Sequence, residues 1–98
     1  MDELQTHFEE FRVVLVRNIK ELTARRPDEQ TTEWYLLKYM RRIYRKVIVS
    51  TSPREIENTI RAPIRFYLDD IEEGSEIEAR CHEVLGSHRR ALRLQRRN

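Results

Sequence analysis

The sequence has little cysteine, which cross-links small folds, and little glycine or proline, which interrupt helices and strands. Its single cysteine, Cys81, excludes an intramolecular disulfide and with it the class of secreted, disulfide-stabilised scaffolds. No apolar run is longer than four residues, the length of Val13 to Val16, whereas a membrane-spanning helix needs roughly 18. The first residues, Met-Asp-Glu-Leu, lack the basic and apolar regions of a signal peptide. We therefore expect a protein without a membrane span, located in the cytoplasm or another reducing intracellular compartment.

The sequence also lacks the motifs that most often carry catalysis. There is no Cys-x-x-Cys pair, no His-Glu-x-x-His motif and no glycine-rich phosphate loop. Cys81 and His82 are neighbours on a helix and point about 100° apart, as do Asp69 and Asp70, so neither pair converges on a substrate. We expect no enzyme, no metal, no cofactor and no small-molecule substrate, and we interpret His88 as a hydrogen-bonded core or interface histidine.

The composition indicates an all-α fold. The 98 residues suffice for one domain, which we expect to span 1–98, and only 2 Gly and 3 Pro interrupt a chain that is 37% charged and 39% hydrophobic. These values favour helices over strands and order over disorder.

Apolar periodicity predicts the first two helices. A stripe at steps of three and four ends near Arg25 and Arg26, before Pro27. Thr31 or Thr32 can cap a second helix that runs to about Val49. The first stripe is Leu4, Phe8, Phe11, Leu15, Ile19 and Leu22; the second is Leu36, Leu37, Met40, Ile43, Tyr44, Val47 and Ile48.

Capping signals predict two further helices. Ser52 with Glu55 forms a capping box around Pro53, and the helix that begins there should kink or split at Pro63. Gly74 fits a helix C′ position, and Ser75 with Glu78 gives a second box. The fourth helix then begins at Glu76, carries the stripe Ile77, Cys81, Val84, Leu85, His88 and Leu92, and ends in a basic tail at about 89–98 that frays after Leu94. Together these elements predict a four-helix bundle-like, up-down arrangement with the third helix kinked or split at Pro63.

Charge is sorted into blocks along the chain. The stretch 34–54 contains six cationic residues and no acidic one, while 69–83 contains seven acidic residues against Arg80 alone. Beyond Glu83, all charged residues are arginines. The net charge of +2 therefore conceals local fields that are much stronger. Such sorting indicates docking surfaces.

The strongest candidate surface is the basic side of the second helix. Helical phasing places its cations opposite the apolar stripe, together with Trp34 and Tyr35. Arginine forks and aromatic rings suit carboxylate groups, phosphates and bases. In the alternative interpretation, this side is merely solvated, or is neutralised by the acidic stretch 69–83. The candidate residues are Trp34, Tyr35, Lys38, Arg41, Arg42, Arg45 and Lys46.

Two further surfaces are weaker candidates. Arg89, Arg90 and Arg93 lie within one arc of the fourth helix, where they suit either the helix dipole or contact with an acidic protein, nucleic acid or anionic lipid. Val13 and Val16 lie away from the first stripe and predict docking of a second copy or a partner. Asn18, inside the stripe, either fixes the register of a coiled coil or marks a polar core position.

These features favour a non-enzymatic helical interaction protein. It would act as an adaptor, small complex subunit or regulator that presents segregated charge to a protein partner, and it would self-associate, for example as a homodimer. The alternative is a nucleic-acid-binding protein in which Trp34 and Tyr35 stack on bases and the C-terminal arginines clamp the backbone.

Overall fold

The computed structural model describes residues 3–61 and 71–97. Within them lie helices α1 (Glu3–Ala24), α2 (Thr32–Val47) and α4 (Glu76–Arg97), together with a short 3₁₀-helix, η1 (Pro53–Ile56). The chain continues as helix over 57–61, and the described residues contain no strand. The all-α prediction is confirmed. The predicted kink at Pro63 lies outside the described residues.

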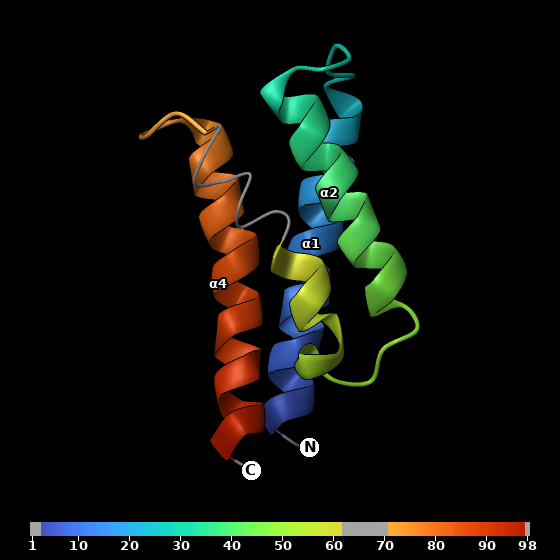
Figure 1. The fold of residues 1–98 in the computed structure, drawn as a ribbon, viewed down its shortest axis with the longest axis vertical. Coiled ribbons are helices and arrows are strands. Elements are labelled where there is room, and N and C mark those ends of the chain that lie inside the picture. The colour runs from blue at the N-terminus through green and yellow to red at the C-terminus, as the bar shows by residue number, and fades with distance from the viewer. Residues whose placement is uncertain (1–2, 62–70, 98) are drawn as a thin grey trace.

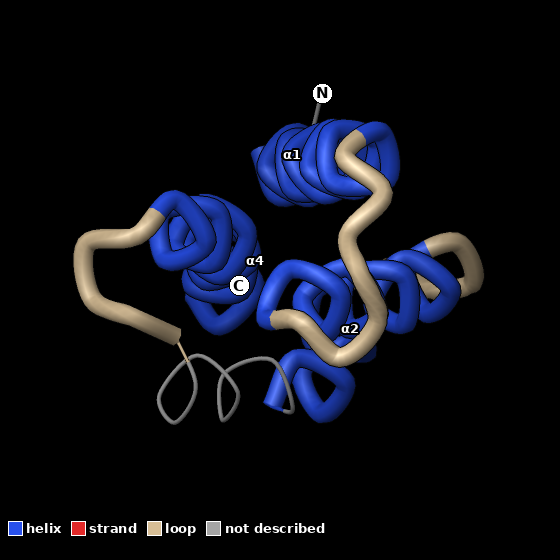
Figure 2. The backbone as a smooth tube through the Cα atoms, turned by 90° about the horizontal axis from the view of Figure 1, so that it is seen from above, coloured by secondary structure: helices blue, strands red, loops and turns tan. Residues whose placement is uncertain are grey.

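The helices form an up-down bundle. α1 runs along the long axis in one direction, α2 returns beside it, and α4 also runs opposite to α1, so that the start of α1 and the end of α4 lie at the same end of the bundle (Figure 1). Viewed along the bundle, α1, α2 and α4 occupy three corners (Figure 2). The interface between α1 and α4 is the most extensive one, followed by that between α1 and α2. The bundle-like arrangement is therefore the observed one.

The predicted stripes build one apolar core. Phe11, Leu15 and Leu22 of α1 are fully buried against α2 and α4, because their spacing keeps them on one side of the helix. Ala91 and Ser87 of α4 are buried as well, outside the predicted stripe. The other members of the core are Phe8, Leu36, Leu37, Met40, Ile43, Val47, Ile56, Ile60, Ile77, Cys81 and Val84.

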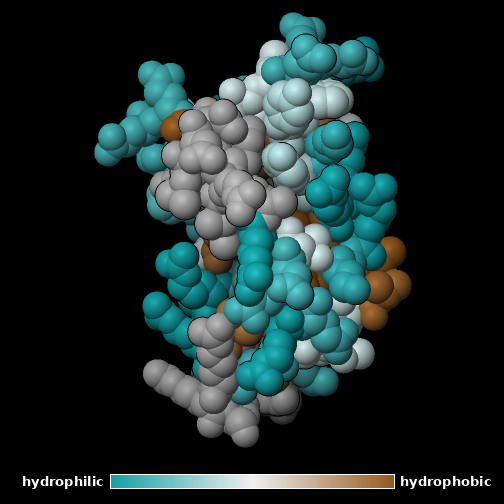
Figure 3. All heavy atoms as spheres, viewed as in Figure 1, coloured by the Kyte–Doolittle hydropathy of each residue, from teal (hydrophilic) through white to brown (hydrophobic). Residues whose placement is uncertain are grey.

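The stripe of α2 extends less far than predicted. Tyr44 is 38% exposed and Ile48 54% exposed, so the buried part of the stripe does not include these two residues. Ile48 follows the end of α2 and, with Val49, belongs to an exposed turn. The apolar patch at this end of α2 is visible at the right of Figure 3. Among the described residues, no helix is both long and apolar enough to cross a bilayer.

Two of the three helix caps predicted from the sequence are present in the structure. The Thr31 side chain accepts a hydrogen bond from the Trp34 amide and begins α2 as predicted. The hydroxyl of Ser75 accepts from the amide of Glu78 and begins α4 at Glu76, also as predicted. α4 then continues as one helix to Arg97, beyond Leu94, where we expected fraying.

The predicted capping box at Ser52 is wrong. Ser52 makes no side-chain cap, and Glu55 accepts hydrogen bonds from the amide and hydroxyl of Thr51 instead. The reason is that the chain enters a 3₁₀ turn at Pro53, which changes which amide lies within reach of the Glu55 carboxylate. These hydrogen bonds from Thr51 lower the pKa of Glu55.

Candidate functional site

The cations on the basic side of α2 are all exposed. Because Thr31 fixes the start of the helix and the apolar stripe points into the core, every cation of α2 is directed to the opposite side. We call these residues the α2 cationic face. They are Lys38, Arg41, Arg42, Arg45 and Lys46, and all five are exposed.

The cations of this face make neutral rather than ionic contacts. The Lys38 Nζ lies 5.5 Å from the centre of the Trp34 ring, and the Arg42 guanidinium carbon lies 5.9 Å from that of Tyr39. Arg41 donates a hydrogen bond of 3.1 Å to the hydroxyl of Thr23 on α1. None of the five forms an ion pair with a carboxylate in the described part of the chain. Apart from the electrostatic attraction between Lys46 and Glu55, these charges therefore have no direct carboxylate partner among the described residues.

The acidic stretch pairs with a different helix. Glu83 of α4 binds Arg17 of α1, and Glu76 binds Arg25 of α1 as well as Arg80 of its own helix. The hydrogen bond from Arg25 is the main reason why the pKa of Glu76 is lowered. The interpretation in which the acidic stretch neutralises the α2 cationic face is not supported by these described pairs. Asp69 and Asp70 lie outside the described residues.

Sequence reasoning missed these arginine partners, although a signal for them exists. Arg17 and Arg25 are eight residues apart on α1, and Glu76 and Glu83 are seven apart on α4. In an antiparallel pair of helices, such spacings bring both arginines opposite both glutamates. The signal becomes usable only once the two helices are known to be antiparallel neighbours.

Asn18 lies at the centre of this α1–α4 contact. Its side chain is fully buried; it donates to Glu83 at 2.9 Å and accepts from Arg80 at 2.8 Å. Partial burial acts to raise the pKa of Glu83, but the hydrogen bonds from Asn18 and Arg17 outweigh it and the pKa is lowered. Asn18 therefore faces the protein's own core, as one of our two interpretations expected, and not the seam of a coiled coil with another chain.

The aromatic residues near the start of α2 are less available than predicted. Trp34 and Tyr35 are half-buried and meet edge to face, with ring centres 5.0 Å apart. Tyr35 also packs against the core. Tyr44, which the periodicity placed in the core, is instead the exposed ring on this side of α2.

A hollow of about 540 Å³ lies between these aromatic residues. Trp34 and Tyr44 line it together with the apolar side chain of Leu37, and three members of the α2 cationic face complete its lining. We call it the Trp34–Tyr44 hollow. Its cationic residues are Lys38, Arg41 and Arg45. Arg42, Arg45 and Lys46 border a second hollow of about 460 Å³ with Asn58 and Thr59.

The C-terminal arginines do not extend this site. Arg89, Arg90 and Arg93 are exposed. Arg89 borders a hollow of about 200 Å³ beside Glu57 and Arg61, and Arg90 borders a different hollow beside α1. Neither hollow includes a residue of α2. The arginines of α4 thus belong to other sides of the bundle.

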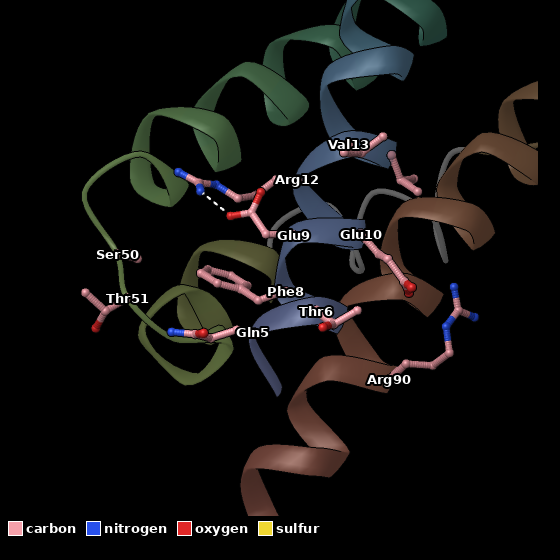
Figure 4. A pocket seen from close by; sticks show the side chains of 11 residues that line it. Gln5, Thr6, Phe8, Glu9, Glu10, Arg12, Val13, Ser50, Thr51 and Arg90 are labelled. Atoms are coloured by element: carbon pink, nitrogen blue, oxygen red, sulfur yellow. Dashed lines mark hydrogen bonds and ion pairs between the residues drawn. The ribbon is translucent and has the colours of Figure 1, made fainter. Parts of the chain in front are cut away.

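The surface of α1 also carries a hollow. It measures about 920 Å³ and extends from the turn at Ser50 and Thr51, across α1, to Arg90 of α4 (Figure 4). We call it the α1 hollow. Val13, which lines it, is 64% exposed, but Val16 is half-buried, so only Val13 offers the free apolar surface that we predicted for both valines.

The two titratable residues of the core, His88 and Cys81, are buried among other side chains. The Nε2 of His88 lies 2.9 Å from the carbonyl oxygen of Pro53, and its ring meets Phe11 edge to face. Burial raises the pKa of the Cys81 thiol to about 12, which leaves it protonated and unreactive near neutral pH. No group of metal-ligating side chains occurs within the described ranges.

No protein-family model, curated protein or solved structure matches this chain. The case for a function therefore depends on the geometry of the surfaces described above.

Proposed function

We propose that the protein is a non-enzymatic helical interaction protein, serving as an adaptor, small complex subunit or regulator, that binds an acidic protein partner through the α2 cationic face. One observation carries the proposal: five exposed cations on one helix lack ion-pair partners in the described chain, while Glu76 and Glu83 are occupied by α1. A partner with carboxylates would find these cations available without breaking any intramolecular ion pair.

The geometry suits recognition more than stability. Uncompensated charges on one helix repel each other, and an isolated exposed pair would contribute only about 0–1 kcal/mol. Complementary charge on a partner removes the repulsion and increases the rate of encounter. The α2 cationic face therefore has a physical use in binding that it lacks in the isolated bundle.

A matched pair of charge reversals tests the proposal. Arg45→Glu changes the α2 cationic face, and Lys20→Glu makes the same change at an exposed position of α1. Binding of a fluorescently labelled, glutamate-rich helical peptide is followed by anisotropy. We expect Arg45→Glu to weaken binding about tenfold and Lys20→Glu to leave it nearly unchanged. Equal effects of both variants, or no binding to the wild-type protein, would contradict the proposal.

Nucleic acid is the alternative ligand, because phosphates also suit free arginines. The aromatic geometry weighs against it: Lys38 lies over the ring of Trp34, and Tyr35 meets that ring edge to face, which leaves little free face for a base. Five phosphate contacts would make affinity fall roughly 500-fold between about 50 and 200 mM salt. The same titration with a single-stranded oligonucleotide measures this slope.

Self-association through the α1 hollow is a second proposed property. It is supported by Val13, whose exposed side chain lies in an open hollow on the outer surface of α1. Light scattering should give a mass above that of one chain, and Val13→Glu should restore the monomer. A wild-type protein that is monomeric at every concentration tested would exclude this property without affecting the role of the α2 cationic face.

A further inference from the structure

We propose that the Trp34–Tyr44 hollow seats one aliphatic side chain from an acidic helical segment of the partner, whose carboxylates pair with Lys38, Arg41 and Arg45. This inference rests on the proposed function and adds to it the chemistry of the partner: an acidic segment with an apolar anchor rather than an acidic segment alone.

The lining of the hollow supports an apolar anchor. Leu37 is buried, Trp34 is half-buried, and Tyr44 presents a large aromatic ring that is 38% exposed. An aliphatic side chain placed here would remove the ring of Tyr44 from water. A purely acidic ligand would contact the cations and leave that apolar surface wet. Apolar surface surrounded by charge is the usual anatomy of a protein interface.

The spacing of the cations supports a helical segment. Lys38, Arg41 and Arg45 are separated by three and four residues, so they lie on one side of α2 and extend over about 10 Å along its axis. A partner helix with carboxylates at the same spacing can lie alongside and meet all three. Its apolar residue, one turn from a carboxylate, then reaches the hollow between the cations.

The contacts of the rim residues leave them free to change partners. Among the described residues, Lys38 contacts the ring of Trp34, Arg41 donates to the neutral hydroxyl of Thr23, and none of the three cations pairs with a carboxylate. Each can turn to a carboxylate without leaving a buried charge unpaired, because all three side chains are exposed.

The test uses Trp34, the only tryptophan in the chain, as a reporter inside the hollow. Two acidic helical peptides of identical charge are titrated against the protein, one with a central leucine and one with glutamine in its place, followed by Trp34 emission and by anisotropy of a label on the peptide. A single-stranded oligonucleotide is the third probe. We expect the leucine peptide to bind roughly tenfold more tightly and to shift Trp34 emission to the blue.

Two variants localise the anchor. Tyr44→Ala removes the exposed ring of the hollow, whereas Ile48→Ala removes an exposed apolar side chain of the same region that does not line it. Tyr44→Ala should abolish the preference for leucine, and Ile48→Ala should preserve it. The peptide pair alone decides the question on the wild-type protein if Tyr44→Ala folds poorly.

The outcomes separate the two proposals. Equal affinity for both peptides, with Arg45→Glu still weakening both, would overturn the hollow as an anchor site and keep the proposed function. Binding of the oligonucleotide but of neither peptide would overturn both proposals in favour of nucleic acid. Failure to bind any of the three probes would overturn both as well.

Discussion

Asn18 offers the sharpest test of how the bundle is held together. It is fully buried between α1 and α4, and its amide donates to Glu83 while its oxygen accepts from Arg80. Asn18→Ala removes both contacts and leaves no group of its own to replace them. The two partners then respond differently, because they differ in access to water.

The magnitude follows from that difference. The Glu83 side chain is 41% exposed, so water can replace the lost amide, whereas the Arg80 side chain is 13% exposed and its Nε already has no hydrogen-bond partner. A hydrogen bond to a charged group contributes about 1.5–3 kcal/mol, and an unsatisfied buried donor costs about as much. Because the Nη1 of Arg80 loses its hydrogen bond to Asn18 but keeps the one to Glu21, we expect Asn18→Ala to lower the free energy of unfolding by about 2 kcal/mol, chiefly through Arg80.

A double-mutant cycle with Arg80→Met isolates this contact. Arg80→Met keeps much of the apolar stem and removes the charge, so Asn18→Ala should cost about 1–2 kcal/mol less in that background than in the wild type. Urea unfolding followed by circular dichroism gives the four free energies. If the two substitutions add to within about 0.5 kcal/mol, the contact carries no coupling and the reasoning about Arg80 is wrong.

Three further predictions concern single residues. The pKa of Glu76 is lowered in the folded protein, so the stability that Glu76 contributes is present above the ordinary glutamate pKa and is lost as pH falls through the lower, folded pKa. Acid unfolding should therefore depend less on pH in this range in Glu76→Gln than in the control variant Glu72→Gln. Cys81, with its pKa raised to about 12 by burial, should react with a thiol reagent at neutral pH only as fast as the protein opens, and fully in denaturant. Gly74 has a φ of +81° and open space around it, so Gly74→Ala should cost about 1 kcal/mol in thermal unfolding, while an effect near zero would show that the turn relaxes.

Helical periodicity predicted the core because burial in a bundle follows it directly. Phe11 and Leu15 of α1, and Cys81 and Val84 of α4, lie where a period of 3.6 places them. The starts of α2 and α4 were equally predictable, since a threonine or serine cap acts on amides within its own turn. Both features are determined by residues that are close in the sequence, so the sequence is enough to predict them.

Features that depend on where another helix ends were not predictable. Tyr44 continues the phase of the α2 stripe, yet it is 38% exposed, so no element in the described part of the chain covers it fully. The exposure of Val13 and the partial burial of Val16 likewise depend on which flank of α1 its neighbours occupy. The helical period of apolar residues gives the direction of a side chain relative to its own helix. It does not say how far a neighbouring helix extends along that side.

The charge blocks show the same division between local pattern and spatial pairing. Sequence order places the basic stretch 34–54 before the acidic stretch 69–83, which invites pairing of one with the other. In the bundle, Glu76 and Glu83 meet arginines of α1 instead, because α1 has its most extensive interface with α4. In its described part, the acidic stretch therefore forms ion pairs that join α1 to α4. The cations of α2 remain without such pairs among the described residues.

The proposed binding of a partner and the packing of α1 on α4 should respond differently to salt. The Debye length is about 8 Å at physiological ionic strength, so contacts made by exposed cations of α2 are screened as salt increases. The exposed ion pairs Arg17–Glu83 and Arg25–Glu76 are screened in the same way, but salt screens the largely buried contact of Arg80 with Asn18 much less, and it does not screen the apolar core between α1 and α4. An acidic partner should therefore dissociate at salt concentrations at which α1 and α4 remain joined. A bundle that lost its helicity over the same range of salt would show that the exposed ion pairs, and not the buried contacts, hold α1 against α4.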